Sequence, residues 1–252
     1  AQMTLHEKVS QMLSWAPAIE RLGIPAYNWW SEGIHGVGRA GTATVFPQAI
    51  GMAAAFDEDM MEQVGNAIGV EARGKYNMCR AHGDRDIFKG LTVWAPNINI
   101  FRDPRWGRGH ETYGEDPFLT SRLGVRFVEG MQGNDPDYLQ AAACAKHFAV
   151  HSGPESDRHH FNAIVSKQDL WETYLPAFRA LVKEAGVEAV MGAYNRTNGE
   201  PCCGSKTLLK DILRDKWHFD GHVTSDCWAI KDFHTGHMVT DGPVESVALA
   251  VN

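Results

Sequence analysis

Several features that would assign this 252-residue sequence to a particular class of protein are missing. It has no run of about 18 apolar residues, so we expect no transmembrane helix. Its formal net charge is −7, which argues against a nucleic-acid-binding protein because such a protein needs a basic face. No internal repeat, low-complexity stretch or Pro/Gly/Ser-rich linker divides the chain. The length then predicts one large domain or two small ones, with neither a membrane nor a nucleic acid as partner.

The N-terminus lacks the basic segment and apolar stretch of a signal peptide. A processed chain would look the same, so the compartment stays open at this point. The cysteines lack the paired CxxC spacing of zinc sites, and their odd number excludes complete internal pairing. Two of them are adjacent, where a bridge would be strained. We therefore expect mostly free, buried thiols at Cys79, Cys144, Cys202, Cys203 and Cys227.

Hydrophobic residues make up 44% of the chain, which is enough for a sizeable core, and helical patterns alternate with short apolar runs. The helix-start signals include a capping-box spacing and several N-cap or N1 residues; they are Thr4 with Glu7, Asp57, Pro117, Ser166 and Ser205. The apolar runs span residues 91–96, 139–145, 187–193 and 221–224. They are mostly apolar on both faces, as expected for strands of a buried parallel sheet.

A polar segment follows each apolar run, at residues 97–108, 146–160, 194–200 and 225–228. In a (β/α)₈ barrel the functional groups lie just beyond the C-terminal ends of the strands, where these segments fall. A doubly wound sheet would alternate in the same way, but no GxGxxG follows the first strand. The pattern therefore predicts an α/β fold, a (β/α)₈ TIM-like barrel. Because the chain stops at Val251-Asn252 in a helical pattern, we expect the barrel to be truncated before its closing strand.

Asp226 lies at the end of the last apolar run, next to Cys227 and Trp228. A carboxylate at a strand end beside an aromatic residue is suited to attack an anomeric carbon, provided that neighbouring groups keep it ionised. The alternative is a helix N-cap, which is a common role for Asp after a strand. The segment by itself leaves both interpretations open.

Lys146 and His147 end the apolar run at 139–145. A cation and an imidazole at a strand end can bind sugar hydroxyls and hold nearby carboxylates ionised, since Lys donates and His can donate or accept. An ordinary salt bridge at a strand terminus is the alternative.

A group of histidines with one carboxylate suggests a metal site: His147, His151, Asp157, His159 and His160. His147 and His151 have i,i+4 spacing, but Gly153-Pro154 indicates a loop rather than a helix. A loop does not hold the two histidines in the geometry that i,i+4 spacing gives on a helix, and we expect no metal site.

Two further segments combine aromatic with charged side chains. The first, Arg102–Arg108, packs three arginines around Trp106, and we expect some of them to brace the loop while one faces a ligand. The second, Tyr27–Glu32, places two indoles beside a carboxylate. Aromatic faces stack on sugar rings and carboxylates accept bonds from hydroxyls, although one Trp could simply belong to the core.

Taken together, six segments resemble glycoside hydrolase family 3 in sequence and in order, over essentially the whole chain. They are YNWWSEGIHGV (27–37), VFPQAIG (45–51), APNINIFRDPRWGRGHETYGED (95–116), ACAKHF (143–148), GAYNRTNG (192–199) and SDC (225–227). The nearest group looks like the bacterial and plant β-xylosidases, with their WWSE and SDC variants.

The resemblance implies an N-terminal (β/α)₈ barrel that needs no cofactor and no metal. It implies that Asp226, in the Ser-Asp pair, is the catalytic nucleophile. The residues implied to grip the terminal sugar are Glu32, Arg108, Lys146, His147, Arg158 and Tyr194; of these, Arg158 is aligned through a variable loop.

The chemistry implied is a retaining, exo-acting β-glycosidase that removes non-reducing terminal sugars by double displacement, with carboxyls about 5–5.5 Å apart. Trp30 beside Glu32 leaves little room for a C6 hydroxymethyl group, which favours 1,4-β-D-xylosides of xylo-oligosaccharides. A β-glucosidase is the alternative within the family, and α-L-arabinofuranosidase is the alternative side activity. A non-catalytic sugar-binding fragment and a metal-dependent barrel hydrolase are alternatives of other classes.

Most of the family takes its acid/base Glu from a C-terminal α/β domain. Residues 1–252 are expected to form the N-terminal barrel domain without that domain, so a C-terminal domain or a companion chain is the expected source. A branch acting on N-acetylglucosaminides uses an Asp-His pair on a Gly-rich loop after the KHF segment; here that loop reads His151-Ser152-Gly153-Pro154-Glu155, and the role is not transferred. The usual place of such enzymes suggests a periplasmic or extracellular protein.

Overall fold

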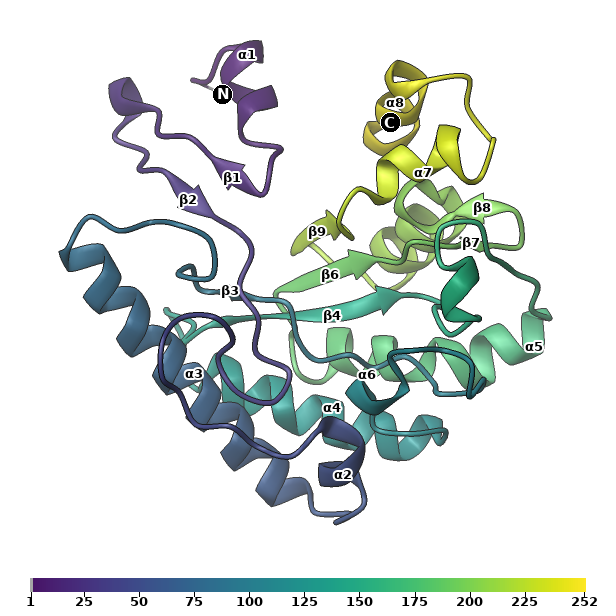
Figure 1. The fold of residues 1–252 in the computed structure, drawn as a ribbon, viewed down its shortest axis with the longest axis horizontal. Helices are drawn as coiled ribbons and strands as arrows, with labels where there is room; N and C mark the ends of the chain where they lie inside the picture. The colour runs from purple at the N-terminus through teal and green to yellow at the C-terminus, as the bar shows by residue number, and fades with distance from the viewer. Residues whose placement is uncertain (1) are drawn as a thin grey trace.

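The computed structural model describes residues 2–252 and shows an α/β fold (Figure 1). Its main sheet has four parallel strands in chain order, β3 (Thr92–Val93), β4 (Ala142–Phe148), β6 (Ala189–Gly192) and β9 (His222–Ser225). The segment before β3 extends the sheet, because Ser31 forms a parallel bridge with Val93. All four predicted strands are confirmed. Consecutive parallel neighbours joined by crossovers are the arrangement of a (β/α) barrel.

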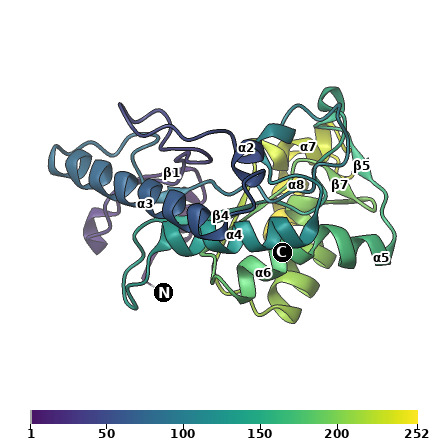
Figure 2. The ribbon, with the colours of Figure 1, turned by 90° about the horizontal axis from the view of Figure 1, so that it is seen from below.

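The crossover helices cover one face of this sheet: α3 (Glu58–Ala81), α4 (Pro117–Gln132), α6 (Pro176–Lys183) and a π-helix over Lys206–Lys216. Figures 1 and 2 show α3, α4 and α6 side by side beneath the strands. Their starts follow local chemistry, since the side chains of Asp57, Asp116 and Ser205 accept hydrogen bonds from backbone N–H groups of the first turn. Ser166 caps the short α5 (Lys167–Asp169) in the same way.

The strands divide their side chains between two apolar clusters. Ala143, Ala145 and Val190 point toward the helices and join the large core, whereas Cys144 and Met191 point to the other face with Trp94. Successive residues of a strand point to opposite faces, so continuous apolar runs are what a sheet buried on both faces requires.

The N-terminal part lies apart from this core. The capping box of Thr4 and Glu7 begins α1 (Leu5–Ser10) as predicted, but no residue of α1 is buried, and Val9, Met12 and Leu13 are exposed. The expected apolar face of this helix therefore has nothing to pack against among the described residues. A two-stranded antiparallel pair, β1 (Trp15–Ala16) with β2 (Tyr27–Asn28), and the short α2 (Ala49–Ala53) lead into α3.

The remaining elements lie near the carboxyl ends of the main strands. A small sheet is formed by β5 (Asn162–Ala163), β7 (Arg196–Thr197) and β8 (Glu200–Pro201). After β9 come α7 (Ala229–Thr235) and α8 (Pro243–Val251), opposite α1 in Figure 1. All five cysteines are free thiols, as predicted, and three of them are buried. Within residues 2–252, no helix combines the length and the apolar character needed to cross a bilayer.

Candidate active site

Five consecutive strand ends bring predicted site residues toward one place. Glu32 directly follows Ser31, which pairs with β3, and Arg108 lies in the loop after β3. Lys146 and His147 belong to the end of β4, Tyr194 follows β6 by two residues, and Asp226 follows β9 directly. The carboxyl ends of parallel strands meet at one edge of the sheet, so polar residues 194 positions apart in the chain become neighbours.

Asp226 is buried, with 6% of its surface exposed. Its Oδ1 accepts a hydrogen bond of 2.7 Å from the N–H of Cys227, and its Oδ2 lies 3.6 Å from Nε2 of His147. Oδ2 has no hydrogen-bond partner among the described residues. The side chain makes no bond to a first-turn N–H of α7, so the helix-cap interpretation of Asp226 does not hold. One carboxylate oxygen is instead directed into the cluster.

Burial raises the pKa of the Asp226 carboxyl above its ordinary value, although the charges of Arg108 and Lys146 and the Cys227 N–H act in the opposite direction. The sequence suggested that nearby cations would keep carboxylates at this edge ionised. For Asp226 the effect of burial is larger than the effect of the two cations.

His147 is held in one tautomer by Asn99. The Asn99 amide nitrogen donates to the carbonyls of His147 (2.8 Å) and Ala149 (3.0 Å), so its Oδ1 must be the acceptor that lies 2.9 Å from His147 Nδ1. Nδ1 therefore carries the proton. Burial, followed by the charge of Arg108, lowers the pKa of His147 well below its ordinary value. The neutral ring presents an unprotonated Nε2 toward Asp226.

Lys146 and Glu32 form the second part of the cluster. The side chain of Lys146 is 4% exposed, and its Nζ lies 3.8 Å from Glu32 Oε2. The other oxygen of Glu32 accepts a 2.7 Å hydrogen bond from the indole of Trp30, which stacks on Trp94. The register of β4 against β6 shifts between Lys146 and Phe148, and such a bulge re-aims side chains. Adjacent residues Lys146 and His147 can thus both reach the cluster.

Arg108 forms a two-pronged ion pair with Glu111, at 2.8 and 2.7 Å. Burial raises the pKa of Glu111, but the bonds from Arg108 and the charge of Lys146 outweigh it and hold this pKa below its ordinary value. By contrast, Arg105 pairs with Asp103 at the surface, and Arg102 donates to the Tyr174 hydroxyl. Arg105 and Arg102 thus brace the loop, and Arg108 lies with the cluster; that one arginine faces a ligand stays a prediction.

Tyr194 and Arg158 complete the cluster. Tyr194 is buried, and burial followed by the charge of Asp226 raises the pKa of its hydroxyl. The guanidinium of Arg158 lies 5.7 Å from the Tyr194 ring centroid and pairs with Glu155. Arg158 is therefore near the cluster through Tyr194, but its charge is already engaged by a carboxylate of its own loop.

The rings of His147 and His151 lie 4.7 Å apart, but each histidine of the suggested metal site has a different hydrogen-bond partner. His147 bonds to Asn99, His151 to Asn195, and His159 to Asp232 at 2.7 Å. Over residues 2–252, no three His, Cys, Asp or Glu side chains are grouped so that they could hold a metal ion.

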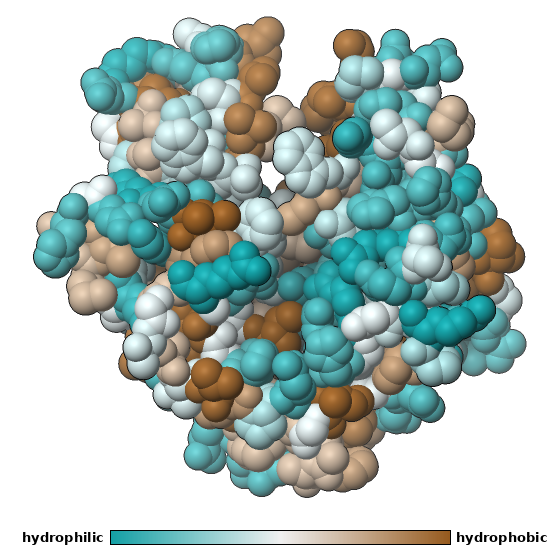
Figure 3. Space-filling view, viewed as in Figure 1, coloured by the Kyte–Doolittle hydropathy of each residue, from teal (hydrophilic) through white to brown (hydrophobic). Residues whose placement is uncertain are grey.

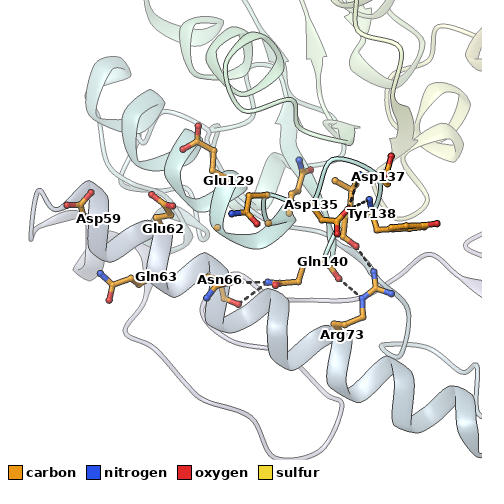
Figure 4. A pocket seen from close by; sticks show the side chains of 15 residues that line it. Asp59, Glu62, Gln63, Asn66, Arg73, Glu129, Asp135, Asp137, Tyr138 and Gln140 are labelled. Carbon is orange, nitrogen blue, oxygen red and sulfur yellow. Dashed lines mark hydrogen bonds between the residues drawn. The ribbon is translucent and has the colours of Figure 1, made fainter.

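A cavity of about 1020 Å³ lies elsewhere, between α3, α4 and the loop before β4 (Figure 4). Arg73 and Asn66 tie this loop to α3 through hydrogen bonds with Gln140 (Figure 4). The loop precedes β4, so this cavity is at the amino ends of the strands, and none of the predicted site residues lines it.

Sequence reasoning missed two residues that shape the cluster. Asn99 sets the tautomer of His147, and Glu111 engages Arg108; neither is among the predicted site residues. Asn99 could have been recognised from its position two residues after Asn97, just beyond an apolar run. Alternate polar residues that are buried at a strand end require hydrogen-bond partners.

Comparison with known proteins gives a consistent result. The description "Glycosyl hydrolase family 3 N terminal domain" matches residues 2–252. A xylan 1,4-beta-xylosidase of Xylanibacter ruminicola is 50% identical over all of this chain and 30% of its own length. A beta-xylosidase/alpha-L-arabinofuranosidase of Medicago sativa subsp. varia is 40% identical over 99% of this chain and 33% of its own.

Solved structures agree. A GH3 exo-beta-xylosidase (XlnD), in complex with a xylobiose aziridine activity based probe, has a TM-score of 0.88 at 34% identity over 98% of this chain and 33% of its own. A beta-glucosidase from Listeria innocua in complex with glucose gives 0.78 and 32%, over 92% of this chain and 30% of its own. This chain thus spans about a third of the length of the relatives it matches.

Proposed function

Because this chain belongs to glycosyl hydrolase family 3, we propose that it carries the nucleophile and the terminal-sugar site of a retaining, exo-acting β-xylosidase. The observation that supports this most directly is the free Oδ2 of Asp226, which is buried, directed into the cluster and surrounded by His147, Arg108 and Lys146. Asp226 Oδ2 attacks the anomeric carbon as the glycosidic C–O bond breaks and the aglycone leaves with a proton from the acid/base. Water, deprotonated by the same acid/base, then cleaves the glycosyl-enzyme ester and frees the sugar and Asp226.

The groups around Asp226 match the hydroxyls of a sugar. His147 Nε2 can only accept, because Nδ1 holds the proton, while Lys146 and Arg108 can only donate. His147 Nε2 and Asp226 Oδ2 are two facing acceptors 3.6 Å apart, and a ring hydroxyl that donates its one proton to Asp226 Oδ2 would lessen their repulsion. Such a hydroxyl also strengthens its bonding to the nucleophile as the transition state forms.

Glu32 and Trp30 support the preference for xylose. The indole N–H holds one oxygen of Glu32, and the other faces Lys146, so Glu32 can accept bonds from vicinal hydroxyls at the far side of the ring. The stacked Trp30 and Trp94 rings occupy space next to Glu32 that a C6 hydroxymethyl group would need. The β-glucosidase alternative is supported by the likeness to the Listeria innocua enzyme.

The acid/base belongs, in this proposal, to a part of the protein outside residues 1–252, in a C-terminal α/β domain or a companion chain. The carboxyl groups of the cluster are poorly suited to donate a proton. Glu111 is paired with Arg108 and its pKa is held low, and Glu32 faces Lys146. An acid that is needed at neutral pH has a raised pKa instead. The relatives' greater length is consistent with a further domain.

The test is a burst experiment with an activated aryl β-xyloside, a 2-fluoro-xyloside trap and intact-mass spectrometry. An activated leaving group departs without an acid, so a stoichiometric burst and a sugar adduct on the peptide that holds Asp226 are expected. Xylose binding without any adduct would instead favour a non-catalytic sugar-binding protein. An adduct on another carboxylate would refute the assignment, and full activity that depends on added metal would favour a metal-dependent hydrolase.

A further inference from the structure

A second, much smaller cavity lies where three loops of the site meet. Its volume is about 10 Å³, and its lining comes from the loops after β3, β4 and β6, including Trp106, His151, Glu155, Arg158 and Asn195. None of these except Arg158 has a part in the proposed reaction.

Three buried polar atoms in this lining have no hydrogen-bond partner within the described part of the chain: Trp106 Nε1, His151 Nε2 and Glu155 Oε2. Trp106 and His151 are each 3% exposed. Buried polar groups in folded proteins almost always have partners. Three such atoms on one small cavity therefore indicate a polar ligand in it.

The hydrogen-bond character of each atom is fixed by its surroundings. Asn195 Nδ2 donates to two carbonyls, of Val150 at 2.9 Å and of Arg196 at 2.8 Å. Its Oδ1 must therefore be the acceptor that lies 3.2 Å from His151 Nδ1. Burial lowers the pKa of His151 to about 3, so Nε2 is a lone-pair acceptor. The indole of Trp106 can only donate, and the Glu155 carboxylate can only accept.

We propose that this cavity binds one water molecule, which accepts the Trp106 N–H and donates to His151 Nε2 and Glu155 Oε2. A water molecule that accepts one hydrogen bond and donates two matches the one donor and two acceptors of this cavity. Three hydrogen bonds are the usual number for a buried water. The cavity has room for about one water and for no sugar.

The water has a consequence for the site. Glu155 uses its other oxygen, Oε1, to pair with Arg158, and Arg158 lies over the ring of Tyr194. The water thus ties the loop that bears Glu155 and Arg158 to the buried Trp106 and His151. Through this water, Trp106, His151 and Glu155 position Arg158. This role of the three residues rests on the proposed function.

The first test is a high-resolution crystal structure of the full-length protein. A density peak about 2.7–3.2 Å from all three atoms is expected. The proposal is overturned by a cavity without density, or by a side chain that turns into the cavity and bonds one of the three atoms directly. This outcome does not depend on any enzymatic activity.

The second test compares Trp106→Phe with Trp217→Phe. Both remove a buried indole N–H that has no partner, but Trp217 packs against Phe148 in the helix-side core and does not line the cavity. Trp106→Phe should lose the water peak and raise KM for an aryl β-xyloside about tenfold, with kcat nearly unchanged. A change that weakens binding of the ground state and of the transition state equally has this effect. Trp217→Phe should change neither.

Equal effects of the two variants would overturn the positioning role. If Trp106→Phe does not fold, the density in the unaltered protein still decides the water site. If the unaltered protein shows the water but hydrolyses no glycoside, the proposed function fails and the water site stands.

Discussion

At the scale of single residues, Asp226 is a buried carboxyl whose free oxygen is useful for chemistry and unfavourable for stability. We predict that Asp226→Asn lowers kcat/KM by more than about 10³-fold, which corresponds to about 4 kcal/mol of transition-state stabilisation. The same change should raise the melting temperature, because a neutral amide avoids the cost of a buried charge. Steady-state kinetics and thermal unfolding of the full-length protein measure both effects.

Asp220→Asn is the control for this change, because Asp220 is exposed on the turn before β9 and should alter neither quantity. Retained turnover in Asp226→Asn would contradict the assignment of the nucleophile. A lower melting temperature would show that the carboxylate is better compensated than its free oxygen indicates.

Trp30 provides a second prediction at this scale. Trp30→Phe keeps the stack on Trp94 but removes the N–H that holds Glu32. Because this bond is present before xylose binds, its loss acts on binding through the orientation of Glu32, and the affinity for xylose, measured by calorimetry, should fall by about tenfold. Trp29→Phe is the matched control, because Trp29 stacks on His222 and makes no bond to Glu32. Equal losses in both variants would argue against a role of Glu32 in binding.

His151 predicts a pH dependence of stability. Its pKa is about 3 in the folded chain and about 6.5 when unfolded. Between these values the unfolded state binds more protons, so the free energy of unfolding falls as pH falls below about 6.5. His151→Gln should make this decline less steep by up to about 1.4 kcal/mol per pH unit. Urea unfolding at pH 7, 6 and 5 measures it, with the exposed His6→Gln as control; parallel curves would contradict it.

At the scale of elements, α3 and α4 approach each other through glycines. A Cβ on Gly130 would lie 2.0 Å from the carbonyl oxygen of Glu62, so Gly130→Ala must push the helices apart. Overpacking typically costs about 1–3 kcal/mol. Gly74→Ala in α3 meets nothing within 4 Å, and it should stabilise by up to about 1 kcal/mol because Ala favours a helix over Gly. Denaturant unfolding distinguishes the two; destabilisation by both would contradict the packing argument.

At the scale of the whole molecule, apolar side chains remain exposed on α8 and near the N-terminus. Figure 3 shows apolar patches on both sides of its upper part. On α8 the exposed residues Val244, Val247 and Val251 share one helix face, and exposed apolar patches favour association. These 252 residues expressed alone should therefore associate with rising concentration in sedimentation experiments.

Val247→Lys should weaken this association, because a charge on the patch resists burial. Val70→Lys is the control, since Val70 is an exposed valine on α3, away from α8. Equal behaviour of the two variants would place the contact elsewhere.

The alternation of caps, apolar runs and polar segments was sufficient to predict the helices that follow those caps, the four parallel strands and the α/β barrel type, but not α2 or α7. Such features depend on interactions between residues a few positions apart, such as Ser205 with Leu208 and Asp57 with Met60. The sequence by itself also determined the family, and with it the placing of Asp226 at a strand end, because six ordered segments specify a common fold.

Only the tertiary structure decided the state of the groups in the cluster. Asn99 fixes the tautomer of His147 from 48 positions away, and Trp106, His151 and Asn195 meet only after the two crossovers from β3 to β4 and from β4 to β6 have formed. Arg108 and Lys146 hold the pKa of Glu111 low, in line with the expectation that cations keep carboxylates at this edge ionised, whereas burial raises the pKa of Asp226. Desolvation and hydrogen-bond direction depend on what surrounds an atom in space, and a local pattern of residues does not contain that information.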